Sequence, residues 1–147
     1  QINAEETGEF VVNMATWDLR DVMNASSAEF GSEISEPERV GIEMLPCLNV
    51  KPPRVARTPV ALECKYHTTV KLTGSDGRLH PSSMIVGEVV GVHVDDAVIV
   101  DGQIDVRKMK PIARLGYMDY SVVEDFFTIK RPERPADAPP SPPKPQH

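Results

Sequence analysis

The sequence is poor in aromatic side chains and lacks the motifs that mark most enzyme classes. Only 5% of its 147 residues are Phe, Trp or Tyr, so we expect a hydrophobic core built from Val, Ile, Leu, Met and Ala. Gly-rich phosphate loops, the H-E-x-x-H zinc motif and the G-x-S-x-G nucleophile turn are all missing. The familiar nucleotide-binding, metalloprotease and serine-hydrolase chemistries therefore have no support in the sequence.

The chain also lacks an excess of positive charge and any long apolar run. It carries 16 Lys and Arg against 22 Asp and Glu, which gives a formal net charge of −6 and a pI near 5.2. Nucleic-acid binding requires clustered Lys and Arg, so this balance argues against a nucleic-acid partner. No apolar stretch approaches a membrane span and no signal peptide opens the chain. We therefore expect a cytoplasmic protein without a membrane partner.

Cysteine and histidine are few and widely separated. Cys47 and Cys64 have no metal-ligand spacing, and no two of the four His residues share one. We therefore expect reduced thiols, no metal and no catalytic side chain. If the chain is an enzyme, an organic cofactor is expected to supply its chemistry.

Short helices and strands are predicted in the first third of the chain. Ser, Asp and Gly at the ends of periodic segments are typical helix caps, and β-branched runs indicate strands. The expected elements are a helix over 1–7 with Gly8 as C-cap, a strand over 10–15, a helix from Asp18 to about Ala28, and a short helix beginning at Ser35.

The clearest pattern in the chain is the alternation from Ala61 to Leu72. Leu62, Cys64 and Tyr66 belong to the apolar set, which predicts a dry face with Cys64 in the core. The intervening set is mostly polar, which predicts a solvated face that carries Glu63, Lys65, His67 and Lys71. The segment is therefore expected to be an antiparallel strand with one wet side.

Residues 84–103 are predicted to form a long strand, a turn at Asp95 and Asp96, and a short return strand. The long strand is apolar on both faces, which indicates that both faces are covered. Strict alternation places Gly87 and Gly91 on one face, where they leave gaps for another backbone or a flat ligand. A turn at Asp76 and Gly77 connects this strand to the preceding one.

The most polar and aromatic loop-like run is 112–120, which follows a short helix capped by Asp105 and ended by Pro111. Within this run Arg114 would pair with a phosphate or ring carbonyl, and Gly116 would permit close backbone approach. Tyr117 and Tyr120 would pack against a flat ring, or alternatively would only plug one end of a barrel. Residues 132–147 are Pro-rich and expected to be disordered, which leaves 1–131 as one domain.

Four segments in order resemble the flavin reductase-like, FMN-binding split-barrel proteins. They are EETGEFVVNMAT, PVALECKYHTTVKL, IVGEVVGVHVDDAVIVDGQIDVRKMKPIARLGYMDYSVV and FTIKRP, and they cover most of Glu5 to Pro132. Within this family, the chain resembles the branch of flavoprotein oxygenase-associated reductases. The resemblance implies a mainly β fold with short helices, an antiparallel split β-barrel that forms a homodimer with FMN at its interface. It also implies NAD(P)H as cosubstrate and, in some members, a partner monooxygenase.

The resemblance implies an FMN contact for Arg114, Gly116, Tyr117 and Tyr120, which match the family's late R-L-G-x-x-x-Y run. Tyr117 stands where a second glycine is common. Family members usually begin with a strand pair and a flavin-binding segment that has no match here, so residues 1–7 are expected to lie inside the helix that follows it. Three functions stay open: an NAD(P)H-dependent flavin reductase, a non-catalytic FMN-binding protein, and a dimeric interaction domain.

Overall fold

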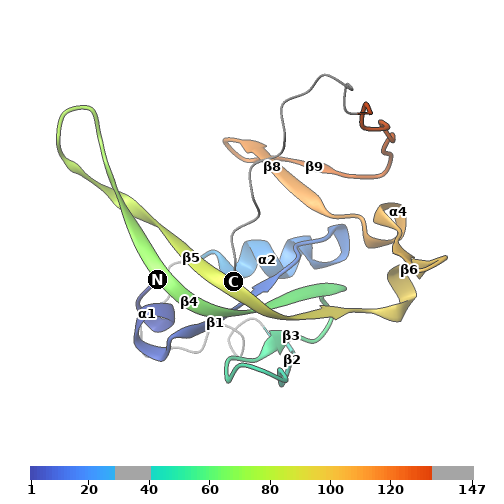
Figure 1. Ribbon diagram of the computed structural model, residues 1–147, viewed down its shortest axis with the longest axis horizontal. Coiled ribbons are helices and arrows are strands. Elements are labelled where there is room, and N and C mark those ends of the chain that lie inside the picture. The colour runs from blue at the N-terminus through green and yellow to red at the C-terminus, as the bar shows by residue number, and fades with distance from the viewer. Residues whose placement is uncertain (29–40, 134–147) are drawn as a thin grey trace.

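The computed structural model describes residues 1–28 and 41–133, which are mainly β (Figure 1). The helix expected from Ser35 and most of the Pro-rich tail lie outside these residues. The helical elements are α1 (Ile2–Thr7), η1 (Trp17–Leu19), α2 (Arg20–Ser26), η2 (Asp96–Val98) and α4 (Val106–Met109). The strands are β1 (Glu9–Asn13), β2 (Met44–Leu45), β3 (Arg54–Val55), β4 (Val60–Thr73), β5 (Leu79–Val94), β6 (Ile99–Val100), β7 (Gln103–Ile104), β8 (Ile112–Gly116) and β9 (Asp119–Val122). No helix in the described part is long and apolar enough to cross a membrane.

A three-stranded antiparallel sheet in the order β1-β4-β5 forms the body of the molecule. One face carries an in-register row of Phe10, Cys64 and Val89 across the three strands. Cys64 is 3% exposed, so its predicted place in the core is confirmed. The predicted dry face is packed only up to Tyr66, because Val70 and Leu72 further along β4 are 38% and 43% exposed.

The opposite face of β4 is not solvated along its whole length, contrary to prediction. Ala61 and Glu63 have no exposed surface, and only from Lys65 onward does this face meet solvent. The loop between β2 and β3 covers the first part, because the Leu48 and Asn49 amides donate hydrogen bonds to the Glu63 carboxylate. A local alternation pattern cannot reveal a loop that folds back over a polar residue.

A β-bulge in β5 also changes the predicted assignment of faces. Glu63 pairs with Gly91, whereas Cys64 pairs with Val89, so β5 contributes one extra residue between these pairs. Paired residues share a face, and neighbours along β4 point to opposite faces, so Val89 and Gly91 lie on opposite sides. The strict alternation that placed Gly87 and Gly91 together is therefore wrong.

Both glycine gaps are filled by side chains of the same chain. A Cβ on Gly87 would lie 2.6 Å from the Phe10 ring, and one on Gly91 would lie 2.5 Å from Asn49 Nδ2. Close approach was predicted at both glycines, but neither gap is open to a flat ligand. Beyond this region, β4 and β5 continue as a ribbon that projects from the body to the predicted turn at Gly77, whose φ is +77° (Figure 1).

Two predicted helix caps are confirmed and one is wrong. Gly8 ends α1 in the left-handed conformation with φ 70°, and the Asp105 carboxylate accepts a hydrogen bond from the Arg107 amide at 2.9 Å. Asp18 lies inside η1, and α2 begins at Arg20 without a side-chain cap. A tight 3₁₀ turn therefore replaces the predicted first turn of this helix.

The segment after β5 differs from prediction in two places. The return strand pairs with its own successor, since β6 and β7 form a separate small hairpin and do not extend the β1-β4-β5 sheet. The run expected to be a loop, 112–120, is instead a second hairpin formed by β8 and β9. Its short strands were hidden by the glycine and the polar residues at its turn.

Candidate functional site

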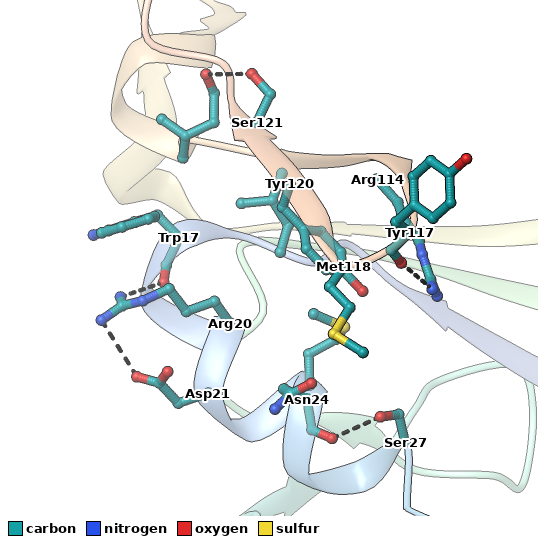
Figure 2. Close-up of a pocket in the computed structure, with 13 residues that line it drawn as sticks. Trp17, Arg20, Asp21, Asn24, Ser27, Arg114, Tyr117, Met118, Tyr120 and Ser121 are labelled. Carbon is teal, nitrogen blue, oxygen red and sulfur yellow. Dashed lines mark hydrogen bonds and ion pairs between the residues drawn. The ribbon is translucent and has the colours of Figure 1, made fainter.

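A cavity of about 520 Å³ lies between the β8–β9 hairpin and the helical segment formed by η1 and α2 (Figure 2). Its volume is in the range of small-molecule and cofactor sites. The residues that line it are Trp17, Arg20, Asp21, Met23, Asn24, Ser27, Ile112, Arg114, Tyr117, Met118, Tyr120, Ser121 and Val122. Three of the four predicted site residues are therefore at this cavity.

The hairpin brings Arg114 and Tyr120 together. The two residues are paired across β8 and β9, so their side chains lie on the same face. The Arg114 guanidinium is 5.9 Å from the centre of the Tyr120 ring, and its Nη2 donates a hydrogen bond to the Tyr117 carbonyl at 2.7 Å. This bond holds the guanidinium at the cavity, and its other N–H donors are used by none of the described residues, so they can bind a ligand.

Gly116 shapes the turn and does not line the cavity. Its φ of +123° is one that side-chain-bearing residues rarely adopt, and nothing lies within 4 Å of the position a Cβ would take. Tyr117 follows with φ 48°, and its ring, 93% exposed, points away from α2 (Figure 2). Met118 instead projects toward α2. The described residues leave the Tyr117 ring almost uncovered, and its packing against a flat ring stays a prediction.

The helical side of the cavity adds residues that sequence reasoning missed. Arg20 stacks over the Trp17 ring at 4.0 Å, donates a hydrogen bond to the Trp17 carbonyl at 2.8 Å, and pairs with Asp21 at 3.3 Å. Asn24 lies one turn further along α2 and also faces the cavity (Figure 2). The available signal was the single Trp of the chain followed at i+3 by Arg, a spacing that places both on one side of a helical turn.

The cavity thus combines cations, aromatic rings and an amide. Arg114 supplies positive charge from one wall, and Arg20, paired with the Asp21 carboxylate, lies on the other. Trp17 and Tyr120 supply flat apolar surfaces. Such a set fits a planar, anionic ligand, because guanidinium groups bind phosphates and carbonyl oxygens while aromatic rings pack against flat rings. Trp17 and Tyr120 remain 45% and 44% exposed, so the cavity is open on one side.

Comparison with known proteins finds one matching domain model and several related sequences. The model of the flavin reductase like domain matches residues 2–111. An uncharacterized protein of Halalkalibacterium halodurans is 32% identical over 88% of this chain and 62% of its own length. An uncharacterized protein of Deinococcus radiodurans is 31% identical over 88% of this chain and 56% of its own length. The chain therefore spans less than two thirds of these relatives.

Several solved structures have a fold similar to that of this chain. Nitrilotriacetate monooxygenase component B from Bacillus cereus matches with a TM-score of 0.79 and 26% identity, over 87% of this chain and 63% of that one. The 2-nitrobenzoate 2-nitroreductase NbaA from Pseudomonas fluorescens matches with a TM-score of 0.71 and 28% identity, over 94% and 65%. A split-barrel protein from Shewanella frigidimarina matches with a TM-score of 0.74 and 22% identity, over 88% and 64%.

These similarities confirm the predicted mainly β split-barrel fold. The match to the domain model ends at residue 111, immediately before β8. The hairpin that carries Arg114, Gly116, Tyr117 and Tyr120 lies outside it, so the assignment of these residues to a cofactor stays a prediction.

Proposed function

Because this chain belongs to the flavin reductase-like domain family, we propose that it binds FMN and acts as an NAD(P)H-dependent flavin reductase. In this proposal it passes reduced flavin or electrons to an acceptor. The observation that carries the proposal is the cavity between α2 and the β8–β9 hairpin, with its two guanidinium groups and two aromatic rings. A cytoplasmic location, expected from the sequence, is part of the same proposal.

The residues present fit FMN. Arg114 and Arg20 would bind the phosphate or the ring carbonyl oxygens, and Trp17 and Tyr120 would pack against the isoalloxazine ring. The Asn24 amide both donates and accepts hydrogen bonds, which suits the mixed donors and acceptors on the ring edge. A bound flavin would supply the ring that accepts a hydride from the nicotinamide.

The chain's own contribution would be binding and orientation. Hydride transfer between two rings depends on stacking geometry and the exclusion of water. We assign no general acid or base to the cavity. The fixed position of the Arg114 guanidinium, held by the Tyr117 carbonyl, would orient the cofactor before the nicotinamide enters.

The open side of the cavity supports the proposal of a homodimer. Tyr117 and Met118 at its rim are 93% and 91% exposed, so one chain alone would leave a bound ring in contact with water. The projecting β4–β5 ribbon likewise exposes Leu72, Met84 and Val86. A second copy that covers these side chains would complete the cavity and exclude water from it.

Two acceptors are favoured by the similarities. Nitrilotriacetate monooxygenase component B is by its name part of a monooxygenase system, which supports a partner monooxygenase for this chain. The similarity to a 2-nitrobenzoate 2-nitroreductase supports a nitroaromatic compound as the second candidate. Both candidates use the same bound flavin and differ only in what takes its electrons.

The test is an FMN titration followed by a turnover assay with the full-length protein. We expect quenching of flavin fluorescence with a 1:1 end point, and NADH or NADPH consumption that depends on added FMN. FMN binding without consumption of either nicotinamide would identify a non-catalytic FMN-binding protein. The absence of FMN binding would contradict the proposal and favour a dimeric interaction domain.

A further inference from the structure

Three side chains with different metal-binding chemistry converge away from the cavity. Cys47 follows β2, Glu63 lies in β4 and His93 lies in β5. The Cys47 sulfur, a Glu63 carboxylate oxygen and a ring nitrogen of His93 all lie within 4.8 Å of one another. Their spacing in sequence indicated no metal site, and only the pairing of β4 with β5 and the folding of the β2–β3 loop bring them together.

Glu63 is held in place as a buried anion. Its side chain is 1% exposed, Oε1 accepts a hydrogen bond from the Leu48 amide at 3.0 Å, and Oε2 accepts one from the Asn49 amide at 2.5 Å. Oε1 also contacts Nε2 of His93. Burial opposes ionisation, but the two amides and His93 outweigh it and lower the pKa of Glu63 to about 2. The site therefore offers a charged oxygen ligand with backbone donors behind it.

The backbone opposite Glu63 is shaped to leave room for these groups. A Cβ on Gly91 would lie 2.5 Å from Asn49 Nδ2 and 3.1 Å from the Glu63 carboxyl carbon. The bulge at this point also puts His93 on the same face as Glu63, since Ala61 pairs with His93 and Glu63 with Gly91. Gly91 and the bulge together let carboxylate and imidazole meet under the loop.

The cluster is reachable from solvent. The His93 side chain is 21% exposed and lines a hollow of about 160 Å³ together with Arg54, Thr58 and Asp95. Arg54 Nε is buried and has no hydrogen-bond partner among residues 1–28 and 41–133, which leaves one donor beside the hollow without an acceptor there. An ion with a water or small anionic ligand at this point would supply that acceptor.

We propose that Cys47, Glu63 and His93 form a binding site for one divalent transition-metal ion of the zinc type. Sulfur, imidazole nitrogen and carboxylate oxygen are the ligands that zinc takes in proteins, at about 2.3 Å for sulfur and about 2.0–2.2 Å for the others. Ligand atoms of a tetrahedral site at these bond lengths lie about 3.3–3.7 Å apart. To bind an ion, the Cys47 sulfur would move inward, while His93 Nε2 and Glu63 Oε1, which now touch, would separate by about 1 Å.

The charges balance when the ion binds. The thiol of Cys47 loses its proton to solvent. In the metal-bound form His93 carries its one N–H at Nδ1 and presents its lone pair at Nε2, and the ion lies between Nε2 and Glu63 Oε1. One thiolate and one carboxylate then neutralise a divalent cation in a largely buried place. The Leu48 and Asn49 amides continue to orient the carboxylate, as outer hydrogen bonds do in metal sites. The fourth position faces the hollow, where Arg54 lies.

Cobalt(II) is the probe for this site, because its absorption reports a bound thiolate. We expect 1:1 binding with a thiolate-to-cobalt charge-transfer band in the full chain, and displacement of the cobalt by Zn²⁺. Cys47→Ala should abolish the band, and His93→Ala should weaken binding by about 10–100-fold. The matched control is Cys64→Ala, which removes the other cysteine from the opposite face of β4 and should leave the band unchanged.

A thermal measurement keeps the test valid if a variant folds poorly. Zn²⁺ should raise the Tm of the native chain and of Cys64→Ala, but not of Cys47→Ala. Absence of 1:1 binding in the native chain, or a band that survives Cys47→Ala, would overturn the proposal. The site shares no residue with the proposed FMN cavity, so its failure would leave the flavin proposal untouched.

Discussion

Glu63 is the largest fully buried side chain in the described part of the chain, and it joins three segments through one carboxylate. Its oxygens bind the β2–β3 loop at Leu48 and Asn49 and the β5 strand at His93. A buried carboxylate is tolerated only when its hydrogen-bonding capacity is satisfied. At the scale of the residue, hydrogen bonds to this one carboxylate attach the β2–β3 loop to the sheet.

Stability should therefore depend on acidic pH through Glu63. Its folded pKa of about 2 lies below the ordinary value of 4.5, so its contribution is present above pH 4.5 and is lost as the pH falls toward 2. Glu63→Gln leaves a buried amide donor unsatisfied, so we expect a Tm lower by more than about 5 °C at pH 7 and a weaker loss of Tm on acidification. Exposed Glu88→Gln is the control, and equal Tm profiles for both variants would contradict this role.

At the cavity, we expect the loss of Arg114 to weaken FMN binding more than the loss of any other lining residue. Arg114→Ala removes a guanidinium that the Tyr117 carbonyl holds in place, so we expect FMN affinity to fall by about tenfold or more. Fluorescence titration measures this, with Arg78→Ala on the exposed turn of the β4–β5 ribbon as control. An unchanged dissociation constant would remove Arg114 from the site.

At the scale of the element, the β-bulge in β5 decides what each glycine does. Because Val89 and Gly91 fall on opposite faces, Gly87 packs against Phe10 on one side of the sheet and Gly91 against Glu63 on the other. A single extra residue thus lets one strand serve the apolar face and the buried polar cluster. The sequence predicted that both faces of this strand are covered, and this is wrong for the single chain, since Val89, Val90 and Val92 are 48%, 37% and 60% exposed.

Substitution of Gly87 should destabilise the sheet. A Cβ would lie 2.6 Å from the Phe10 ring and 2.8 Å from the Lys65 carbonyl oxygen. The carbonyl belongs to the backbone of the paired strand, so moving it would distort the sheet. We expect Gly87→Ala to lower the free energy of unfolding by about 1–3 kcal/mol in urea denaturation. Glu88→Ala, the next residue and exposed, should change it by less than about 0.5 kcal/mol. Similar values for both would show that the close contact is relieved at no cost.

At the scale of the whole molecule, the homodimer proposed above is based on the projecting β4–β5 ribbon and the open cavity. An isolated two-stranded ribbon is marginally stable in water, yet this one carries exposed Leu72, Met84 and Val86 along its length. A second copy would bury these side chains and close the rim beside Tyr117. The proposed flavin chemistry therefore depends on the proposed dimer, because the second copy would exclude water from the cavity.

Charge placed on the ribbon should separate the subunits. We expect the native chain to elute as a dimer and the double variant Met84→Glu with Val86→Glu to elute as a monomer, because association would bury the new carboxylates. Light scattering coupled to size exclusion measures the mass, and FMN affinity should fall with it. Thr73→Glu near the turn of the same ribbon is the control. A monomeric native chain would contradict the homodimer.

The sequence by itself determined the β-rich class, the family, the helix caps at Gly8 and Asp105, and the packed face of β4 that holds Cys64. These features depend on local periodicity, on capping chemistry or on the order of recognisable segments, and each of these can be read directly from the sequence. The pairing of the hairpin at 112–120 and its position opposite Trp17 and Arg20 could not be predicted in this way, because pairing and cavity formation depend on residues distant in sequence.

Tertiary structure alone decided the burial of Glu63 and its meeting with Cys47 and His93. Alternation predicted a solvated Glu63, since a polar residue between Leu62 and Cys64 normally faces water. A loop fifteen residues earlier supplies the amides that make burial tolerable, and a bulge between Val89 and Gly91 turns His93, thirty residues after Glu63, toward the same point. Because both causes are non-local, no pattern within β4 contained them.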